Sequence, residues 1–517
     1  MKKARKLLRI VFGRTIFVVV FLLIQLGILF AGMRWLSEYL IYFYWVYVLF
    51  GALVVIYILN EDANPSFKMA WIVPVLVFPV FGCLFYIFIQ LQVATKLIAK
   101  RQKMLAKETE KWLEQEKNTA ARLAEADAGE VNLAKYMKQH GGFPVYQNTA
   151  VSYFPLGEDK FEVLKRELRA AKHFIFLEYF IVEPGIVWNS ILEILEEKVK
   201  EGVEVRMMYD GMCSLVLLPY HYPKELQAKG IHCKMFSPIK PALSTHQNNR
   251  DHRKIVVIDG HTAFTGGINL ADEYMNLKVR FGHWKDTAVM IKGDAVKSFT
   301  MMFLQMWNTT ERQPENYERY LCKDMPCRMD GMMRTGGFVM PYGDSPLDNE
   351  HVGESVYLDI LYRAEKYVHI MTPYLILDHE MEVALCYAAK RGVETVILMP
   401  HIPDKLYAYL LARSYYQELI RAGVQIYEYT PGFVHAKMFA SDDKRAVVGT
   451  INLDYRSLYL HFECAAYFYQ NPVVLDVERD FQETLKKCQK ITLQECRRFP
   501  AWKRFAGRAL RLFAPLM

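Results

Sequence analysis

The hydrophobic pattern divides the chain into an apolar N-terminal region and a longer region of mixed character. Three stretches without charged residues lie in the N-terminal region, namely Thr15–Met33, Tyr39–Leu59 and Met69–Ile89. Each approaches the roughly 20 apolar residues that a helix needs to cross a bilayer. The first stretch is longer than the apolar core of a signal peptide and lacks an Ala-x-Ala cleavage site. The pattern predicts two or three transmembrane helices within residues 1–90.

Basic clusters flank this region, one between Lys2 and Arg14 and one between Lys96 and Lys103. Both clusters favour the cytoplasmic side of a membrane, which an even number of crossings would satisfy. Three apolar stretches leave two alternatives: one stretch is re-entrant, or the catalytic part is outside. Pro74 and Pro79 make the third stretch the better candidate for a partial span. We therefore expect a multi-pass protein of the cell membrane with its catalytic part at the cytoplasmic face.

The pattern changes after the apolar region. Residues 91–135 are rich in Lys, Glu, Gln and Ala, which predicts a solvated helical linker. Beyond it, helical segments alternate with short Val/Ile-rich runs, which is typical of α/β layers. The segment Arg169–Phe180 is matched later by Arg363–Tyr374, so the chain contains an internal duplication. We expect two similar α/β/α domains, at residues 136–325 and 326–517, related by a pseudo-twofold axis.

Each copy ends in the same set of residues: a histidine, a lysine two positions later, an aspartate seven positions later and an asparagine seventeen positions later. They are His252, Lys254, Asp259 and Asn269 in the first copy, and His435, Lys437, Asp442 and Asn452 in the second. A single His-x-Lys-x4-Asp is a weak signal, but two copies at matching places of a repeat are a strong one.

The spacing of these residues suits phosphate chemistry. A histidine and a lysine two positions apart on a strand point to the same face, so each pair can converge on one ligand. The two lysines, with Asn269 and Asn452 as donors, would bind an oxyanion. One histidine can then attack phosphorus while the other protonates the leaving alkoxide and later deprotonates the acceptor. This chemistry requires no metal and no cofactor, because the lysines neutralise the charge.

Each histidine also needs a partner that fixes its tautomer. Asp286 and Glu463 occupy corresponding places downstream of the two motifs, so they are the candidates. Asp259 and Asp442 belong to the catalytic motif, but they can alternatively hold the turn after the strand without carrying a proton.

Composition and charge narrow the choice of partner. The 517 residues are 52% hydrophobic, and the net charge of +8 favours an anionic partner such as a membrane surface or a nucleic acid. The nine cysteines show no disulfide framework.

These motifs closely resemble those of the phospholipase D superfamily, whose mark is the duplicated His-x-Lys-x4-Asp. Within it, the strings Asn249–Gly260, Gly266–Tyr274 and Gly449–Ser457 resemble bacterial cardiolipin synthases, as do Asn64–Trp71 and Pro79–Tyr86 in the apolar region. The resemblance implies that one phosphatidylglycerol forms a phosphatidyl-histidine and releases glycerol, after which a second phosphatidylglycerol attacks to give cardiolipin. By analogy with the superfamily, His252 is the favoured nucleophile. The stretch Thr15–Met33 goes beyond the two spans common in the family.

Three other functions remain open on the sequence alone. A membrane phospholipase D hydrolase would use water as the acceptor, and the sequence does not show how well the site excludes water. A nuclease would act on a soluble substrate, which the apolar region argues against, so no nucleic-acid partner is expected. A catalytically silent scaffold is disfavoured because both motifs are intact.

Overall fold

The structure is a computed structural model that describes residues 20, 23–27, 30, 40–90, 93–237, 249–311, 313, 315–321 and 333–516. It divides into two compact units. Unit 1 contains the described parts of residues 1–96 and 509–517, and unit 2 contains those of residues 97–238 and 249–508.

The described part of unit 1 is mainly helical. Its helices are α3 (Leu40–Asn60), α4 (Pro65–Val77) and α5 (Pro79–Gln90). Asn64 caps α4 by accepting a hydrogen bond of 2.9 Å from the Ser66 amide. A small apolar cluster joins the three helices, built from Ile58, Ile72, Val75, Cys83 and Tyr86.

The expected membrane spans are only partly represented in the structure. The stretch at 15–33 lies largely outside the described residues. The second stretch forms α3, and the third is divided between α4 and α5 at Phe78, because Pro79 cannot continue the hydrogen-bonding pattern of α4. Among the described residues, no helix combines the length and apolar character required to cross a membrane.

Unit 2 confirms the predicted α/β class and contains two similar sheets. The first sheet has the strand order β10-β1-β9-β7-β6-β2-β3-β4. Its strands are β1 (Thr149–Phe154), β2 (Phe174–Tyr179), β3 (Glu204–Asp210), β4 (His232–Phe236), β6 (Ile255–Ile258), β7 (Thr262–Gly266), β9 (Ala288–Gly293) and β10 (Arg334–Thr335). Its main helices are α9 (Gly157–Ala170), α10 (Ile186–Lys200), α12 (Tyr222–Ala228) and α13 (Val296–Trp307).

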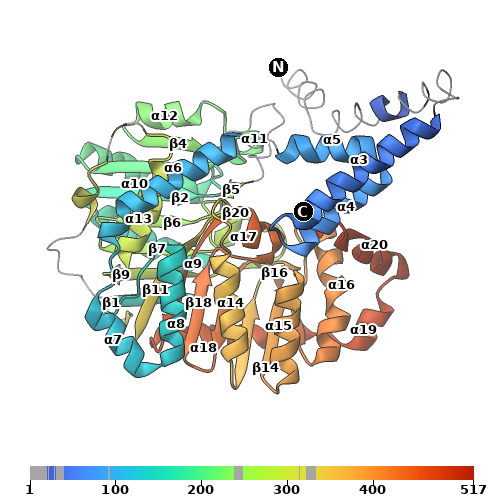
Figure 1. Ribbon diagram of the computed structural model, residues 1–517. Helices are drawn as coiled ribbons and strands as arrows, with labels where there is room; N and C mark the ends of the chain where they lie inside the picture. Colours follow the sequence, from blue (N-terminus) through green and yellow to red (C-terminus); the bar gives the residue numbers. More distant parts are fainter. Residues whose placement is uncertain are drawn as a thin grey trace. The chain divides into compact units, whose positions relative to one another are not determined.

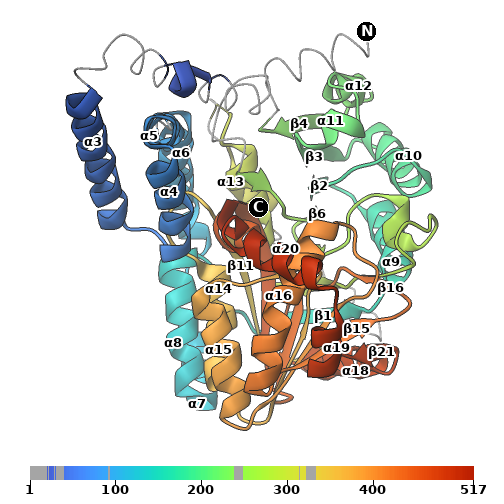
Figure 2. The same cartoon turned by 90° about the vertical axis from the view of Figure 1, so that its right-hand side faces the viewer.

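The second sheet repeats this arrangement, with the order β11-β20-β18-β17-β12-β14-β15-β21. Its strands are β11 (Phe338–Asp344), β12 (Tyr367–Met371), β14 (Glu394–Pro400), β15 (Gln425–Tyr429), β17 (Met438–Ser441), β18 (Arg445–Gly449), β20 (His461–Tyr469) and β21 (Cys488–Lys490). Helices α14 (Val352–Arg363), α15 (His379–Lys390) and α16 (Leu406–Ala422) lie side by side along it (Figures 1 and 2). Strand for strand, β1-β9-β7-β6-β2-β3-β4 corresponds to β11-β20-β18-β17-β12-β14-β15, as expected for a duplication.

The two halves of unit 2 share one hydrophobic core. A single cluster of buried side chains includes Val257 and Phe299 from the first half and Val448 and Phe468 from the second. At the junction, the Thr265 hydroxyl lies 3.4 Å from the Cys464 sulfur. Continuous burial across the junction holds the two sheets in a fixed relation, which matters because each half contributes to the same site.

The linker is helical as predicted, but it is not simply solvated. It forms α6 (Val93–Thr109), α7 (Lys117–Ala126) and α8 (Ala128–Tyr136). Glu130 on α8 is fully buried and forms ion pairs of 2.6 Å with Arg445 and 2.9 Å with Arg363. These ion pairs attach the linker to the second half of unit 2. The Lys/Glu-rich composition of the linker did not predict this attachment. The predicted domain boundary at 325/326 is also crossed, because β10 pairs with β1 of the first half.

Candidate active site

Each motif histidine is attached to a strand of the opposite half. Strand β5 (Arg250–Asp251) runs parallel to the start of β20, and the His252 amide donates a 2.9 Å hydrogen bond to the Phe462 carbonyl. Strand β16 (Gly432–Val434) runs parallel to β8 (His283–Lys285), and the His435 amide donates a 2.7 Å hydrogen bond to the Lys285 carbonyl. The two exchanges are equivalent by the internal duplication.

The predicted carboxylates pair with the histidines across the two halves. The His252 Nδ1 lies 2.9 and 3.0 Å from the two carboxylate oxygens of Glu463. The His435 Nδ1 lies 2.6 Å from Asp286 Oδ2. Both carboxylates are completely buried. A neutral imidazole that donates its Nδ1 proton to a carboxylate keeps the Nε2 lone pair free, which is the form required of a nucleophile or a base.

The motif lysines are also buried, with 1% of each residue exposed. The Lys254 ammonium donates a 2.6 Å hydrogen bond to the His252 carbonyl, and that of Lys437 donates to the His435 carbonyl. Burial lowers the pKa of Lys254 to about 8. It lowers the pKa of Lys437 to about 7, with a further contribution from the charge of Lys254. Because Lys254 acts electrostatically on the second motif, the two lysines contribute to one positive site.

Burial keeps both histidines in the neutral form. The pKa of His435 falls to about 4, because burial and the charges of Lys437 and Lys254 outweigh the attraction of Asp286. Burial and Lys254 likewise lower the pKa of His252 well below its ordinary value. Burial alone would raise the pKa of Asp286 and Glu463, but their histidine partners lower both values. The resting site therefore contains neutral imidazoles beside ionised carboxylates.

The two asparagines are held by hydrogen bonds at equivalent places. Asn269 donates to the Tyr274 hydroxyl at 2.7 Å and accepts from the Ile181 amide at 3.0 Å. Asn452 donates to the Ser457 hydroxyl at 3.0 Å. Each side-chain amide nitrogen has a second N–H that is able to donate to a phosphate oxygen. The role of Asn269 and Asn452 as phosphate donors stays a prediction.

A glycine and a threonine at equivalent positions support the two carboxylates. A Cβ atom added to Gly267 would lie 2.1 Å from Asp286 Oδ1, so glycine is required where this carboxylate approaches the backbone. At the corresponding position, the Thr450 hydroxyl donates a hydrogen bond to Glu463 Oε2.

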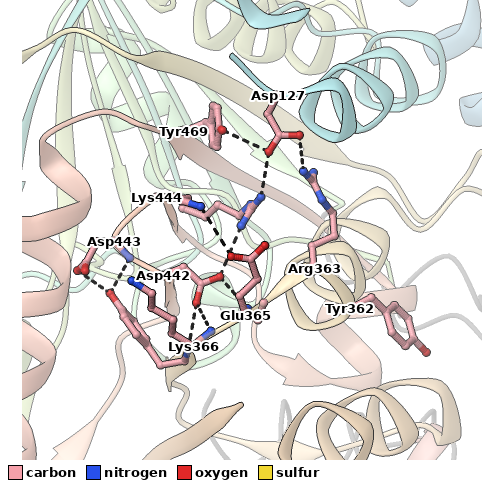
Figure 3. Close-up of polar contacts among 12 residues, drawn as sticks. Asp127, Tyr362, Arg363, Glu365, Lys366, Asp442, Asp443, Lys444 and Tyr469 are labelled. Carbon is pink, nitrogen blue, oxygen red and sulfur yellow. Dashed lines mark hydrogen bonds and ion pairs between the residues drawn. The ribbon is translucent and has the colours of Figure 1, made fainter. Parts of the chain in front are cut away.

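The structure does not bring the motif aspartates to the histidines. Asp259 follows β6, at the opposite end of that strand from His252, and its carboxylate accepts hydrogen bonds of 2.8 Å from the amides of residues 172–174. Asp442 similarly accepts bonds of 2.8–3.0 Å from the amides of residues 365–367 (Figure 3). Both aspartates have positive φ values, of 50° and 57°. They hold the turn before the neighbouring strand, so the structure favours the structural alternative over a catalytic role.

The residues on either side of His252 form a buried ionic network. The Arg253 guanidinium lies 2.6 Å from Glu178 and 3.3 Å from Asp251. The Asp251 amide donates a 3.0 Å hydrogen bond to Asp210. This network fixes the backbone on both sides of His252.

Sequence reasoning missed two further residues, Trp284 and His461, which pack beside the catalytic histidines. Each lies two positions before a predicted carboxylate, and this spacing was the signal that could have identified them.

His461 also belongs to a group of potential metal ligands: ligand atoms of His252, His461 and Glu463 all lie within 4.8 Å of one another. Two imidazoles and a carboxylate are suitable zinc ligands, but two of the three already form the histidine–carboxylate pair.

The duplicated fold and the convergent motifs define a protein of the phospholipase D superfamily. A family model described as "Cardiolipin synthase, PLD-like domain" matches residues 164–307 and 357–485, and "Phospholipase_D-nuclease N-terminal" matches residues 46–90. The chain belongs to the cardiolipin synthase family, whose members are phosphatidyltransferases of the phospholipase D type.

Relatives match over most of the chain. A cardiolipin synthase of Geobacillus kaustophilus is 34% identical, over 91% of this chain and 92% of its own length. A cardiolipin synthase of Alkalihalophilus pseudofirmus is 32% identical, over 91% and 93%. An uncharacterized protein of Streptococcus mutans is 50% identical, over 90% and 99%. Phosphatidylserine synthase of Haemophilus influenzae shares the fold, with a TM-score of 0.53 at 14% identity, covering 74% of this chain and 97% of its own.

Proposed function

We propose that this enzyme makes cardiolipin by transferring the phosphatidyl group of one phosphatidylglycerol to a second. The observation that carries the proposal is the pair of buried histidine–carboxylate contacts, each of which joins the two halves, beside two buried lysines. This arrangement supplies a nucleophile, a proton carrier and positive charge for one phosphodiester, without assigning a step to a metal or cofactor.

In the first half-reaction, the Nε2 of His252 attacks phosphorus and the P–O bond to glycerol breaks. His435, which is neutral in the resting site, first takes up a proton, and the negative charge of the bound phosphodiester favours this protonation. It then gives the proton to the leaving oxygen, which releases glycerol. Asp286 stabilises the cationic imidazole that this step requires. The product is a phosphatidyl-histidine, with the phosphoryl oxygens beside Lys254 and Lys437.

In the second half-reaction, neutral His435 removes a proton from the hydroxyl of another phosphatidylglycerol. The oxygen attacks phosphorus, the P–N bond to His252 breaks and cardiolipin leaves. His435 is then protonated again for the next cycle, so protons and charge balance over the two steps.

We further propose that the enzyme is a multi-pass protein of the cell membrane, with phosphatidylglycerol and other membrane lipids as its partners and its catalytic unit at the cytoplasmic face. Support comes from the exposed apolar side chains of α3, where Trp45, Leu49 and Leu53 are 62%, 62% and 56% exposed. Such a surface suits contact with lipid rather than water. The net charge of +8 suits an anionic lipid surface.

Vesicles of phosphatidylglycerol alone provide the test. Purified full-length enzyme should produce cardiolipin and free glycerol in equal amounts, and His252→Ala and His435→Ala should each abolish turnover. Phosphatidic acid as the main product would identify water as the acceptor and the enzyme as a hydrolase. Trapped radiolabelled intermediate should map to His252, and label on His435 would reverse the two histidine roles.

A further inference from the structure

Trp284 and His461 occupy equivalent positions in the two halves. Trp284 lies on β8, two residues before Asp286, and His461 begins β20, two residues before Glu463. The ring centroids of Trp284 and His435 are 5.3 Å apart, and those of His461 and His252 are 5.4 Å apart. Each strand therefore brings both a carboxylate and a second polar ring to the catalytic histidine of the opposite half.

Strand geometry places the second ring on the catalytic side. Side chains two positions apart on a strand face the same way. His461 and Glu463 on β20 thus face the same side. Asp286 follows β8 directly, and both it and Trp284 contact His435. Both rings contact the catalytic imidazoles rather than a remote part of the core.

Both residues carry buried nitrogen atoms that have no hydrogen-bond partner among the described residues. Trp284 is 6% exposed and its Nε1 is unpaired, while His461 is 8% exposed and both of its ring nitrogens are unpaired. The His461 Nδ1 lies 3.7 Å from Glu463 Oε1, which is too long for a hydrogen bond. Unpaired buried polar atoms are costly, and these lie at two equivalent places beside the catalytic imidazoles, where a bound substrate would supply the missing partners.

We propose that Trp284 and His461 are substrate-binding residues that hydrogen-bond oxygen atoms on opposite sides of the reacting phosphorus. The proposal rests on the function proposed above and assigns each residue to one part of the lipid. Trp284 lies beside His435, which transfers the proton, so its N–H binds an oxygen of the glycerol headgroup that leaves or attacks. His461 lies beside His252, so its ring binds a phosphoryl or ester oxygen of the phosphatidyl group that is retained.

The chemical difference between the two rings makes the halves of the site unequal. An indole offers only a donor, whereas an imidazole offers a donor and an acceptor. The aromatic surroundings also differ, because Trp284, Tyr274 and Phe433 pack against His435. On the other side, Phe180 packs against His252. The duplicated catalytic groups are thus surrounded by different binding groups, as required when one side holds a headgroup that is exchanged and the other a phosphatidyl group that is kept.

Ring-preserving substitutions test the proposal with little loss of packing. Trp284→Phe removes the N–H but keeps an aromatic ring, and His461→Phe removes both nitrogens. His461→Asn restores a donor and an acceptor and should rescue His461→Phe in part. Trp112→Phe is the matched control, because the Trp112 Nε1 is also buried without a partner but is not among the residues that contact the catalytic histidines.

The assay uses mixed micelles of phosphatidylglycerol and a non-ionic detergent, with quantification of cardiolipin, phosphatidic acid and trapped phosphohistidine. Loss of one neutral hydrogen bond should lower the rate of the affected step about 2- to 13-fold. We expect Trp284→Phe to slow the transfer step and raise the share of phosphatidic acid. We expect His461→Phe to slow formation of the phosphohistidine without changing the product ratio.

The outcomes separate this inference from the proposed function. Interchanged effects of the two variants would support the binding roles and identify His435 as the nucleophile. If the wild type only hydrolyses its lipid, the proposed transfer fails, and slower phosphohistidine formation in His461→Phe still supports the inference. Rates and product ratios within twofold of wild type for both variants, as for Trp112→Phe, would overturn it. The inference would also be overturned if each variant lost activity only as far as its lowered melting temperature explains, and if His461→Asn restored none of the activity lost in His461→Phe.

Discussion

Replacing Asp286 with asparagine should disable a histidine that belongs to the other half of the duplication. Asp286 Oδ2 lies 2.6 Å from His435 Nδ1, and the carboxylate is completely buried. Asparagine has nearly the same shape, so the packing should survive. The substitution removes the negative charge that stabilises the cationic form of His435 and fixes its tautomer.

The size of the effect follows from the electrostatics of the pair. Two unit charges about 4 Å apart interact with about 4 kcal/mol at an effective dielectric constant of about 20. Loss of that stabilisation in the transition state corresponds to a fall of about a thousandfold in kcat. Glu463→Gln should act similarly on His252, because the Glu463 carboxylate contacts its Nδ1 at 2.9 Å.

The measurement is the rate of cardiolipin formation by purified enzyme in phosphatidylglycerol vesicles, with melting temperature recorded in parallel. Asp259→Asn is the control, because the Asp259 carboxylate binds three backbone amides and not a catalytic histidine. It should lower the free energy of unfolding by about 1–3 kcal/mol with little change in kcat of the folded enzyme. A kcat within tenfold of wild type for Asp286→Asn would refute the electrostatic argument, and so would a greater catalytic loss in Asp259→Asn.

Three further predictions concern the same site. Between pH 6 and 9, kcat/KM should fall as Lys437 and Lys254 lose their protons, because their pKa values are about 7 and about 8 and phosphate binding needs their charge; a flat profile in buffered micelles would contradict this. Gly267→Ala should reduce activity about 100-fold or more, since its Cβ would lie 2.1 Å from Asp286 Oδ1 and displace a carboxylate on which proton transfer depends; wild-type kinetics would show that the carboxylate tolerates the shift. Dialysis against EDTA should leave turnover unchanged because lysines supply the positive charge, whereas full loss restored by one specific cation would reveal a metal requirement.

Much of the fold and site could be predicted because the signals are local and repeated. Alternation of helices with Val/Ile-rich runs predicted α/β layers, and the structure confirms that class in unit 2. The matching positions of Asp286 and Glu463 downstream of the two motifs identified both residues that contact the histidines. These inferences need only strand alternation and duplication, which do not depend on how distant segments meet.

Composition was less reliable where long-range contacts decide the outcome. The charged residues of the linker predicted a solvated helix, yet Glu130 is buried because Arg363 and Arg445 pack against it. Asp259 and Asp442 share the motif with the histidines, but the length of each strand carries them to its far end. A residue's neighbours in sequence do not report which charges or backbone amides reach it in space.

The sequence by itself determined that this protein has two related halves, each with a histidine, a lysine two positions later and a carboxylate downstream. The expected placement of each histidine and lysine on a strand is wrong, because residues 252–254 lie between β5 and β6 and residues 435–437 between β16 and β17. Only the tertiary structure decided that each histidine takes its carboxylate from the other half. That exchange depends on the parallel pairing of β5 with β20 and of β16 with β8. These strand pairs are formed by backbone hydrogen bonds, which are nearly independent of side-chain identity. No pattern of residues therefore predicts the two pairings.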